Sequence, residues 1–234
     1  MKRLIAILLM VMVFLTGCSN LGLTPPPKIE DQVQDILWVG DDQILTGPLD
    51  MQTILLLEIG GITELRQMKR IVSPRFTLTS VFDESEFLKN IDIEKVDLVI
   101  IQAFGINRDF TDQEFMINAK SWLDYFQIHQ KQVLIFYPWF SKVEAESEKV
   151  RLDRLIHQLV WEEGLTLIPV GPTWQTTIKE NPEINLFGKD GIHPSAEGVY
   201  LSACVFFASF TGESPVDLPV STSVGFDTPD EIVK

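Results

Sequence analysis

The chain has 234 residues, a formal net charge of −14 at pH 7, 45% hydrophobic residues and 22% charged residues. That apolar content is too high for a disordered chain and is sufficient for one full hydrophobic core. The acidic balance argues against a nucleic-acid partner, because phosphate binding requires clustered Lys and Arg. Two cysteines exclude a disulfide framework and a structural zinc site. We expect no cofactor and no bound metal.

The N-terminus has the pattern of a targeting segment. Lys2 and Arg3 precede an apolar run, Leu4–Leu15. This run is shorter than the ~20 residues that a membrane-spanning helix needs, and it fits the apolar region of a signal peptide. The run ends in Leu15-Thr16-Gly17-Cys18, which resembles the lipobox of bacterial lipoproteins.

The lipobox resemblance implies that Cys18 becomes the first mature residue and carries acyl chains. Its membrane partner is then the bilayer that holds those chains, since two or three chains give stable anchoring. The following residue is Ser19 rather than Asp. In lipoproteins of double-membrane bacteria this residue indicates transport to the outer membrane, on its periplasmic side. We therefore expect a lipid-anchored protein of the bacterial cell envelope.

Composition divides the chain into four segments. Residues 1–17 are the predicted signal peptide, and residues 18–34 form a lipid-anchored tether. Three consecutive prolines in the tether, Pro25–Pro27, favour extended polyproline II structure. Residues 35–212 form the predicted domain, and residues 213–234 form a C-terminal extension.

Apolar runs bounded by turn residues predict strands, and apolar residues at helical spacing predict helices. The expected strands are Ile36–Val39, Arg70–Val72, Val96–Gln102, Val133–Tyr137 and Leu165–Val170. The expected helices are Leu49–Leu65, Asp83–Asn90, a helix behind a capping box of Thr111 and Glu114, Glu144–Glu163, and a last helix whose first turn holds Pro194.

This alternation of strands and helices predicts an α/β domain of three layers around a five-stranded parallel sheet. In such sheets, binding sites lie beyond the carboxyl ends of the strands. The segment after the first strand is Gly40-Asp41-Asp42, and the segment after the third is Gln102–Asn107. Asp190 and His193 stand just before the last helix, at a spacing that lets the carboxylate orient the imidazole.

These segments resemble the conserved blocks of the SGNH (GDSL) hydrolase superfamily. Asp190–Leu201 matches the last block, D-G-x-H-P-S-x-x-G-x-Y-L, and Leu37–Asp42 matches the first, a strand followed by G-D-S. The resemblance covers residues 35–212 and implies a flavodoxin-like fold with ester-hydrolase chemistry. It assigns His193 as the base and Asp190 as the residue that orients it, with acyl esters, including acetylated sugars, as typical substrates.

The sequence departs from the family pattern at the nucleophile. Asp42 stands where the family has its catalytic serine. In the second block, Arg75 or Phe76 stands where related sequences have an oxyanion-stabilising glycine. The resemblance leaves two candidates for the amide that donates to the oxyanion, Gln102 and Asn107.

A carboxylate at position 42 disfavours the usual reaction. It carries no hydroxyl for His193 to deprotonate, and its attack on an ester would give a mixed anhydride. If Asp42 occupies the place of the serine, His193 lies between two carboxylates that favour the imidazolium. A charged imidazole cannot accept a proton, so the general-base role fails near neutral pH.

Three other interpretations of these residues stay open. Asp42 can be a loop acid that caps the following helix. A divalent metal can bind Asp41 and Asp42 together with Asp190 and His193. A hydrolase can also act through a water molecule or through another serine, such as Ser73 or Ser141.

We therefore expect an SGNH-like domain whose catalytic site is degenerate and which acts by binding. The alternative is an active esterase, deacetylase or acyltransferase on acylated glycans that uses Asp190 and His193. Among the remaining residues, Cys204 is expected to be buried and Trp161 to be at least half-buried. Trp139 and Trp174 follow the fourth and fifth strands, where they pack in the core or line the cleft.

Overall fold

The computed structural model describes residues 35–41, 43, 49–62, 69–72, 77–83, 87, 91–106, 108–216 and 218. The predicted signal peptide, the tether and most of the C-terminal extension lie outside these residues. So do Cys18, Asp42, Ser73, Arg75, Phe76 and Asn107. In the described part of the chain, no helix is long and apolar enough to span a bilayer.

The parallel sheet predicted from the sequence is present. Its strands lie in the order β2-β1-β3-β4-β5, and every neighbouring pair is parallel. The strands are β1 (Ile36–Gly40), β2 (Lys69–Val72), β3 (Leu98–Gln102), β4 (Gln132–Phe136) and β5 (Thr166–Ile168). In the central register, Trp38 of β1 pairs with Ile100 of β3.

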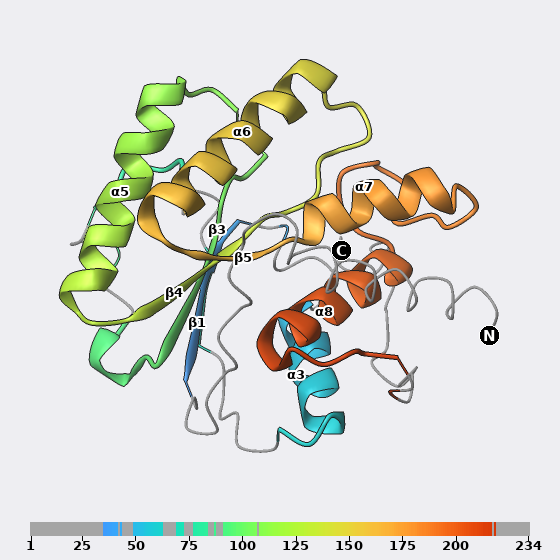
Figure 1. Ribbon diagram of the computed structural model, residues 1–234, viewed down its shortest axis with the longest axis horizontal. Helices are drawn as coiled ribbons and strands as arrows, with labels where there is room; N and C mark the ends of the chain where they lie inside the picture. Colours follow the sequence, from blue (N-terminus) through green and yellow to red (C-terminus); the bar gives the residue numbers. More distant parts are fainter. Residues whose placement is uncertain are drawn as a thin grey trace, which may run out of the picture.

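Helices cover both faces of this sheet and complete the three layers. The helices are α3 (Leu49–Ile59), α5 (Asp112–Ile128), α6 (Glu146–Glu163), α7 (Val170–Glu180) and α8 (Ala196–Thr211), with a 3₁₀ turn η3 (Ile93–Lys95). Helices α5 and α6 lie on one side of the sheet, and α3 and α8 lie on the other (Figure 1). Helix α7 packs beside α8.

Alternation along the strands divides the core into two clusters. In β1, Ile36 and Trp38 face the cluster that includes α3 and α8. Leu37 and Val39 face the opposite cluster, with α5 and α6. All four side chains are buried, as expected for a strand covered on both faces.

Local sequence explains where α5 and α6 begin and end. The Thr111 hydroxyl accepts from the Glu114 amide at 3.2 Å, and a Glu114 carboxylate oxygen accepts from the Thr111 amide at 2.7 Å. This is the predicted capping box at the start of α5. Helix α6 ends at Gly164, whose φ of 63° is left-handed and costs glycine little.

Three predicted helices have different bounds in the structure. Helix α6 begins at Glu146 rather than at residue 144, and most of the predicted helix Asp83–Asn90 lies outside the described residues. Helix α3 ends at Ile59 rather than at residue 65, because Gly60 and Gly61 form a turn and Gly61 adopts a φ of 93°. Helix α8 begins at Ala196, with the Ser195 hydroxyl as its cap. Pro194 therefore precedes the helix and forms an isolated bridge with Phe187, rather than occupying the first helical turn.

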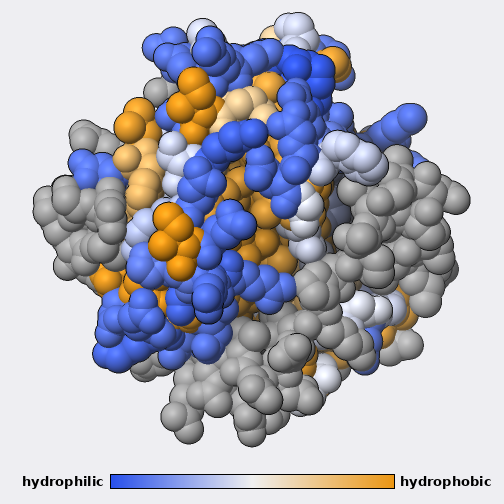
Figure 2. Space-filling view, turned by 60° about the vertical axis from the view of Figure 1, so that its left-hand side comes forward, coloured by the Kyte–Doolittle hydropathy of each residue, from blue (hydrophilic) through white to orange (hydrophobic). Residues whose placement is uncertain are grey.

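Helix α7 and the position of Trp161 differ from what the sequence predicts. Helix α7 begins directly after β5, and Pro172 and several threonines give it little intrinsic helix propensity. Trp161 on α6 is 79% exposed, against the expected half-buried position. Among the residues that Figure 2 colours by hydropathy, hydrophilic side chains are widespread on this face, and hydrophobic residues show between them. Cys204 is buried, as predicted. Every residue of α8 from Gly198 to Thr211 is buried as well.

Candidate active site

The loop before α8 brings His193 and Asp190 together. Nδ1 of His193 lies 2.5 Å from Oδ2 of Asp190, the direct contact that their spacing predicts. The other carboxylate oxygen accepts from the backbone amides of Ile192 at 2.9 Å and His193 at 3.0 Å. One carboxylate thus shapes the loop and orients the ring, so the pair has the geometry of the acid and base of a hydrolase.

These contacts also change the acidity of Asp190. Its partial burial alone would raise the pKa of the carboxyl. Hydrogen bonds from the Ile192 amide and from the ring and amide of His193 outweigh burial, so the pKa of Asp190 lies below its ordinary value. The carboxylate therefore stays ionised through the neutral and mildly acidic range.

Distant parts of the chain hold this loop in place. The Lys142 amide, in the segment after β4, donates to the Gly191 carbonyl at 2.9 Å. The indole N–H of Trp139 donates to the Ile192 carbonyl at 2.9 Å. Inside the loop, the Gly188 amide donates to the His193 carbonyl at 2.8 Å. The dyad is therefore fixed by both its own turn and the loop that follows β4.

A second polar group lies buried at the carboxyl ends of β1 and β3. The side-chain nitrogen of Gln102 lies 2.8 Å from Oδ1 of Asp41, 3.0 Å from Oε1 of Gln43 and 2.8 Å from the Phe104 carbonyl. The Asp41 amide donates back to Oε1 of Gln102 at 3.1 Å. Oδ2 of Asp41 accepts from the Ile106 amide at 3.0 Å. The three side chains, Asp41, Gln43 and Gln102, are almost completely buried.

This network bears on the two oxyanion candidates. An amide nitrogen has two hydrogens, and that of Gln102 already faces three acceptors. Donation to an oxyanion would therefore require Gln102 to leave a buried partner. Asn107, the other candidate, lies outside the described residues. So does Asp42, although both of its neighbours in sequence, Asp41 and Gln43, belong to the network.

Arg108 is a charged residue near this edge that the sequence analysis did not single out as functional. Its guanidinium stacks over Phe104 at 4.3 Å and lies 3.5 Å from Glu144. Nε and Nη1 are buried without a hydrogen-bond partner. Burial lowers the pKa of Arg108, and the nearby carboxylates of Glu144 and Asp41 partly oppose this shift. The only signal in sequence was an arginine directly after the Gly105–Asn107 segment.

The metal interpretation finds no support in the part of the chain that the structure covers. No group of three or more His, Cys, Asp or Glu side chains there is placed to hold an ion. The interpretation also involves Asp42, which is not among those residues.

Comparison with known proteins shows which solved structures have a similar fold. No protein-family model and no curated protein matches the chain. Among solved structures, a candidate SGNH hydrolase from Slackia heliotrinireducens matches with a TM-score of 0.58 and 15% identity, covering 76% of this chain and 99% of its own. A candidate GDSL-like lipase from Parabacteroides merdae matches with a TM-score of 0.63 and 15% identity, covering 79% and 99%.

An acetylxylan esterase from Geobacillus stearothermophilus is similar at the same level. It matches with a TM-score of 0.62 and 15% identity, covering 80% of this chain and 96% of its own. The described domain therefore has the α/β fold of SGNH hydrolases, as its sequence blocks predict. At this identity the likeness concerns the fold alone.

Proposed function

We propose that the chain is a lipid-anchored protein of the bacterial cell envelope whose SGNH-like domain binds acylated glycans without hydrolysing their esters. The observation that carries this proposal combines the dyad in the structure with a departure in the sequence. The His193–Asp190 contact is intact at 2.5 Å, whereas the residue at the nucleophile position in sequence is Asp42. A base and its orienting carboxylate without a hydroxyl cannot form an acyl-enzyme.

The buried network supports the same conclusion. Gln102 is bound to Asp41, Gln43 and the Phe104 carbonyl, and loss of one oxyanion donor costs roughly 10²–10³ in rate. The acylated-glycan ligand comes from the fold, because one of the similar structures is an acetylxylan esterase. The anchor rests on the segment ending in Leu15-Thr16-Gly17-Cys18.

Ester hydrolysis by the purified protein is the first test. The wild type is assayed against p-nitrophenyl acetate near neutral pH, together with Asp42→Ser and the double variant Asp42→Ser, Arg75→Gly, each with and without His193→Ala. We expect an inert wild type. We also expect Asp42→Ser to gain a slow activity that His193→Ala removes, because the serine restores a hydroxyl and takes away a carboxylate.

Wild-type turnover that His193→Ala abolishes would overturn the proposal. It would instead establish the second candidate, an active esterase or acyltransferase. The direct contact between His193 and Asp190 is the observation that favours that candidate, and the nucleophile would then be a water or another serine. Inert variants throughout would support the binding role.

Binding is tested with acetylated xylo-oligosaccharides and with the same oligosaccharides after chemical deacetylation. Calorimetric titration of the wild type should show tighter binding of the acetylated form. His193→Ala should weaken that preference, because the ring lies at the edge of the sheet where we place the acyl group. Equal affinity for both forms would contradict acyl recognition.

The anchor is tested by growing cells with a clickable fatty acid. The wild type should be labelled, and Cys18→Ser should abolish the label and leave an uncleaved precursor. Equal labelling of the variant would show that the lipobox interpretation is wrong.

A further inference from the structure

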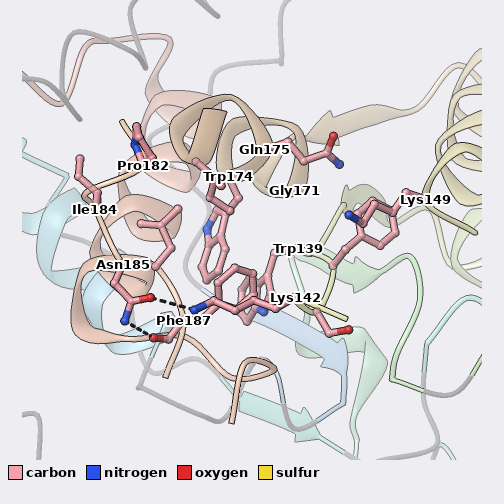
Figure 3. Close-up of a pocket in the computed structure, with 14 residues that line it drawn as sticks. Trp139, Lys142, Lys149, Gly171, Trp174, Gln175, Pro182, Ile184, Asn185 and Phe187 are labelled. Atoms are coloured by element: carbon pink, nitrogen blue, oxygen red, sulfur yellow. Dashed lines mark hydrogen bonds between the residues drawn. The ribbon is translucent and has the colours of Figure 1, made fainter. Parts of the chain in front are cut away.

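A cavity of about 280 Å³ lies beside the dyad loop. Its walls come from the loop after β4, from Lys149 of α6, from α7, and from Pro182 and residues 184–187, which lead directly into the loop carrying Asp190 and His193. In its lining, the rings of Trp139 and Trp174 stack on each other, with their centroids 4.6 Å apart (Figure 3). This volume is just below the ~300–1,000 Å³ of most small-molecule sites, so the cavity suits a ligand of about one sugar ring.

The lining of this cavity is unusual for so acidic a chain. The whole sequence has 33 acidic and 19 basic residues, yet no Asp or Glu lines the cavity, and two lysines do. Lys142 reaches in beside Asn185 and Phe187, and Lys149 stands on the opposite side with Gln175 (Figure 3). The local charge is therefore opposite to that of the molecule.

The two ammonium groups differ in how they are neutralised. Lys149 lies 3.4 Å from Glu146, which is highly exposed, so that pair is weak. Nζ of Lys142 donates to Oδ1 of Asn185 at 3.2 Å and lies 5.2 Å from the centroid of the Phe187 ring. Neither partner carries a negative charge. Lys142 is therefore the group best placed to pair with an anion from solution.

The remaining walls show what the rest of such a ligand must be. Ile178, which is 40% exposed, provides an aliphatic surface. The almost completely buried side chains of Ile184, Leu186 and the Trp139–Trp174 stack complete the apolar wall. Ser141, Gln175 and Asn185 provide a hydroxyl and two amides around the cavity. An apolar wall with a few hydrogen-bonding groups and a cation suits a ring with one hydrophobic face, several hydroxyls and a carboxylate.

We propose that this cavity binds an acidic sugar unit, a hexuronate, whose carboxylate pairs with Lys142 and, more weakly, with Lys149. This inference rests on the proposed glycan-binding function and narrows its ligand to glycans that contain uronic acid. The backbone amide of Lys142 and the indole of Trp139 both bind the dyad loop. A uronic acid in the cavity would therefore lie next to the loop that carries His193.

The test is a ligand-observed NMR titration of the purified full-length chain with D-glucuronate, D-glucose and hexanoate. The variants are Lys142→Met and Lys149→Met, which keep the aliphatic stem and remove the charge. The matched control is Lys95→Met, an exposed lysine whose ion pair is with Asp92 in its own turn. Circular dichroism verifies that each variant is folded.

We expect glucuronate to bind at least about tenfold more tightly than glucose, because a charge-assisted hydrogen bond replaces a neutral one. Lys142→Met should weaken glucuronate binding about tenfold and Lys149→Met less, whereas Lys95→Met should leave it unchanged. Added salt should weaken binding to the wild type.

The inference would be overturned by equal binding of glucose, by full affinity in the Lys142→Met variant, or by an equal loss in the Lys95→Met control. Tighter binding of hexanoate than of glucuronate would replace the acidic sugar with an aliphatic carboxylate and would also overturn it. The free monosaccharides carry no acyl group. Failure here therefore leaves the proposed acyl-glycan binding intact. Failure with acetylated oligosaccharides removes acyl recognition and leaves only the binding of a uronate unit in this cavity, so the two failures are distinguishable.

Discussion

Gln102 and Asp41 bind each other twice across the boundary between β1 and β3. The Gln102 amide donates to Oδ1 of Asp41 at 2.8 Å, and the Asp41 backbone amide donates to Oε1 of Gln102 at 3.1 Å. Both side chains are buried. Side chain and backbone thus lock the end of one central strand to the end of the other, at the edge where the site lies.

Replacing this amide should therefore destabilise the domain. In Gln102→Leu the new side chain has a volume similar to that of glutamine. The substitution removes the oxygen that accepts from the Asp41 backbone amide and the nitrogen that donates to the Phe104 carbonyl. We expect a loss of about 2–4 kcal/mol in the free energy of unfolding, measured by urea titration with circular dichroism. The control is Gln127→Leu on the exposed face of α5, which should change stability by less than about 0.5 kcal/mol. Equal effects of the two substitutions would contradict the argument.

The dyad loop should show a defined dependence on pH. Because the pKa of Asp190 is lowered in the folded protein, its carboxylate stabilises the fold above the ordinary Asp pKa. That contribution disappears as the pH falls through the lowered value. The stability difference between the wild type and Asp190→Asn should thus shrink as the pH falls below about 4.

Urea titrations at a series of pH values measure this difference. The matched variant is Asp124→Asn, which removes an exposed carboxylate from α5. A difference for Asp190→Asn that grows as the pH falls below about 4 would contradict the hydrogen bonds we assign to this carboxylate. An equal pH dependence of Asp124→Asn would also contradict this assignment.

The strands and the dyad were predictable because local sequence determines them. Continuous apolar runs mark β1 and β3, and the capping box marks the start of α5. The spacing of Asp190 and His193 is itself a turn motif, since the carboxylate binds amides two and three residues ahead. In each case the interacting groups lie within a few residues of one another.

The missed features depend on contacts between distant residues. Helix α7 has weak intrinsic propensity and is stabilised by burial of Trp174, whose indole N–H donates to the Ser202 hydroxyl of α8 at 3.0 Å. The contact of Lys142 with the dyad loop joins residues about fifty positions apart. The three contacts of the Gln102 side-chain nitrogen likewise depend on strands that are neighbours only in the folded sheet. No local pattern encodes these contacts.

The thiol of Cys204 should be almost inert in the native protein. Burial within α8 raises its pKa to about 12, although the neighbouring Tyr200 hydroxyl opposes this shift. The chain has two cysteines, so a Cys18→Ser background leaves Cys204 alone. At pH 8 we expect its reaction with a thiol reagent to be at least roughly 10³-fold slower in the native state than in guanidinium chloride. Comparable rates in both states would show that the helix is accessible.

Gly198 should be intolerant of even one added methyl group. It lies in the first turn of α8, where its amide donates to the capping hydroxyl of Ser195 at 3.1 Å. A Cβ at this position would lie 2.2 Å from the Leu186 carbonyl oxygen and 2.8 Å from the Trp174 ring. The Leu186 oxygen also accepts from the Ser195 amide at 2.9 Å, so it cannot move without breaking the entry to the helix.

Gly198→Ala therefore sets two effects against each other. Alanine favours a helix by about 1 kcal/mol relative to glycine, whereas overpacking in a rigid core costs about 1–3 kcal/mol or more. The contact is with backbone as well as with a buried ring, so we expect a net loss of about 2 kcal/mol in urea titrations followed by circular dichroism. Glu197→Ala, at the exposed neighbouring position, should change stability by less than about 1 kcal/mol. Unchanged or increased stability of Gly198→Ala would show that α8 and α7 are not packed as closely as the structure places them.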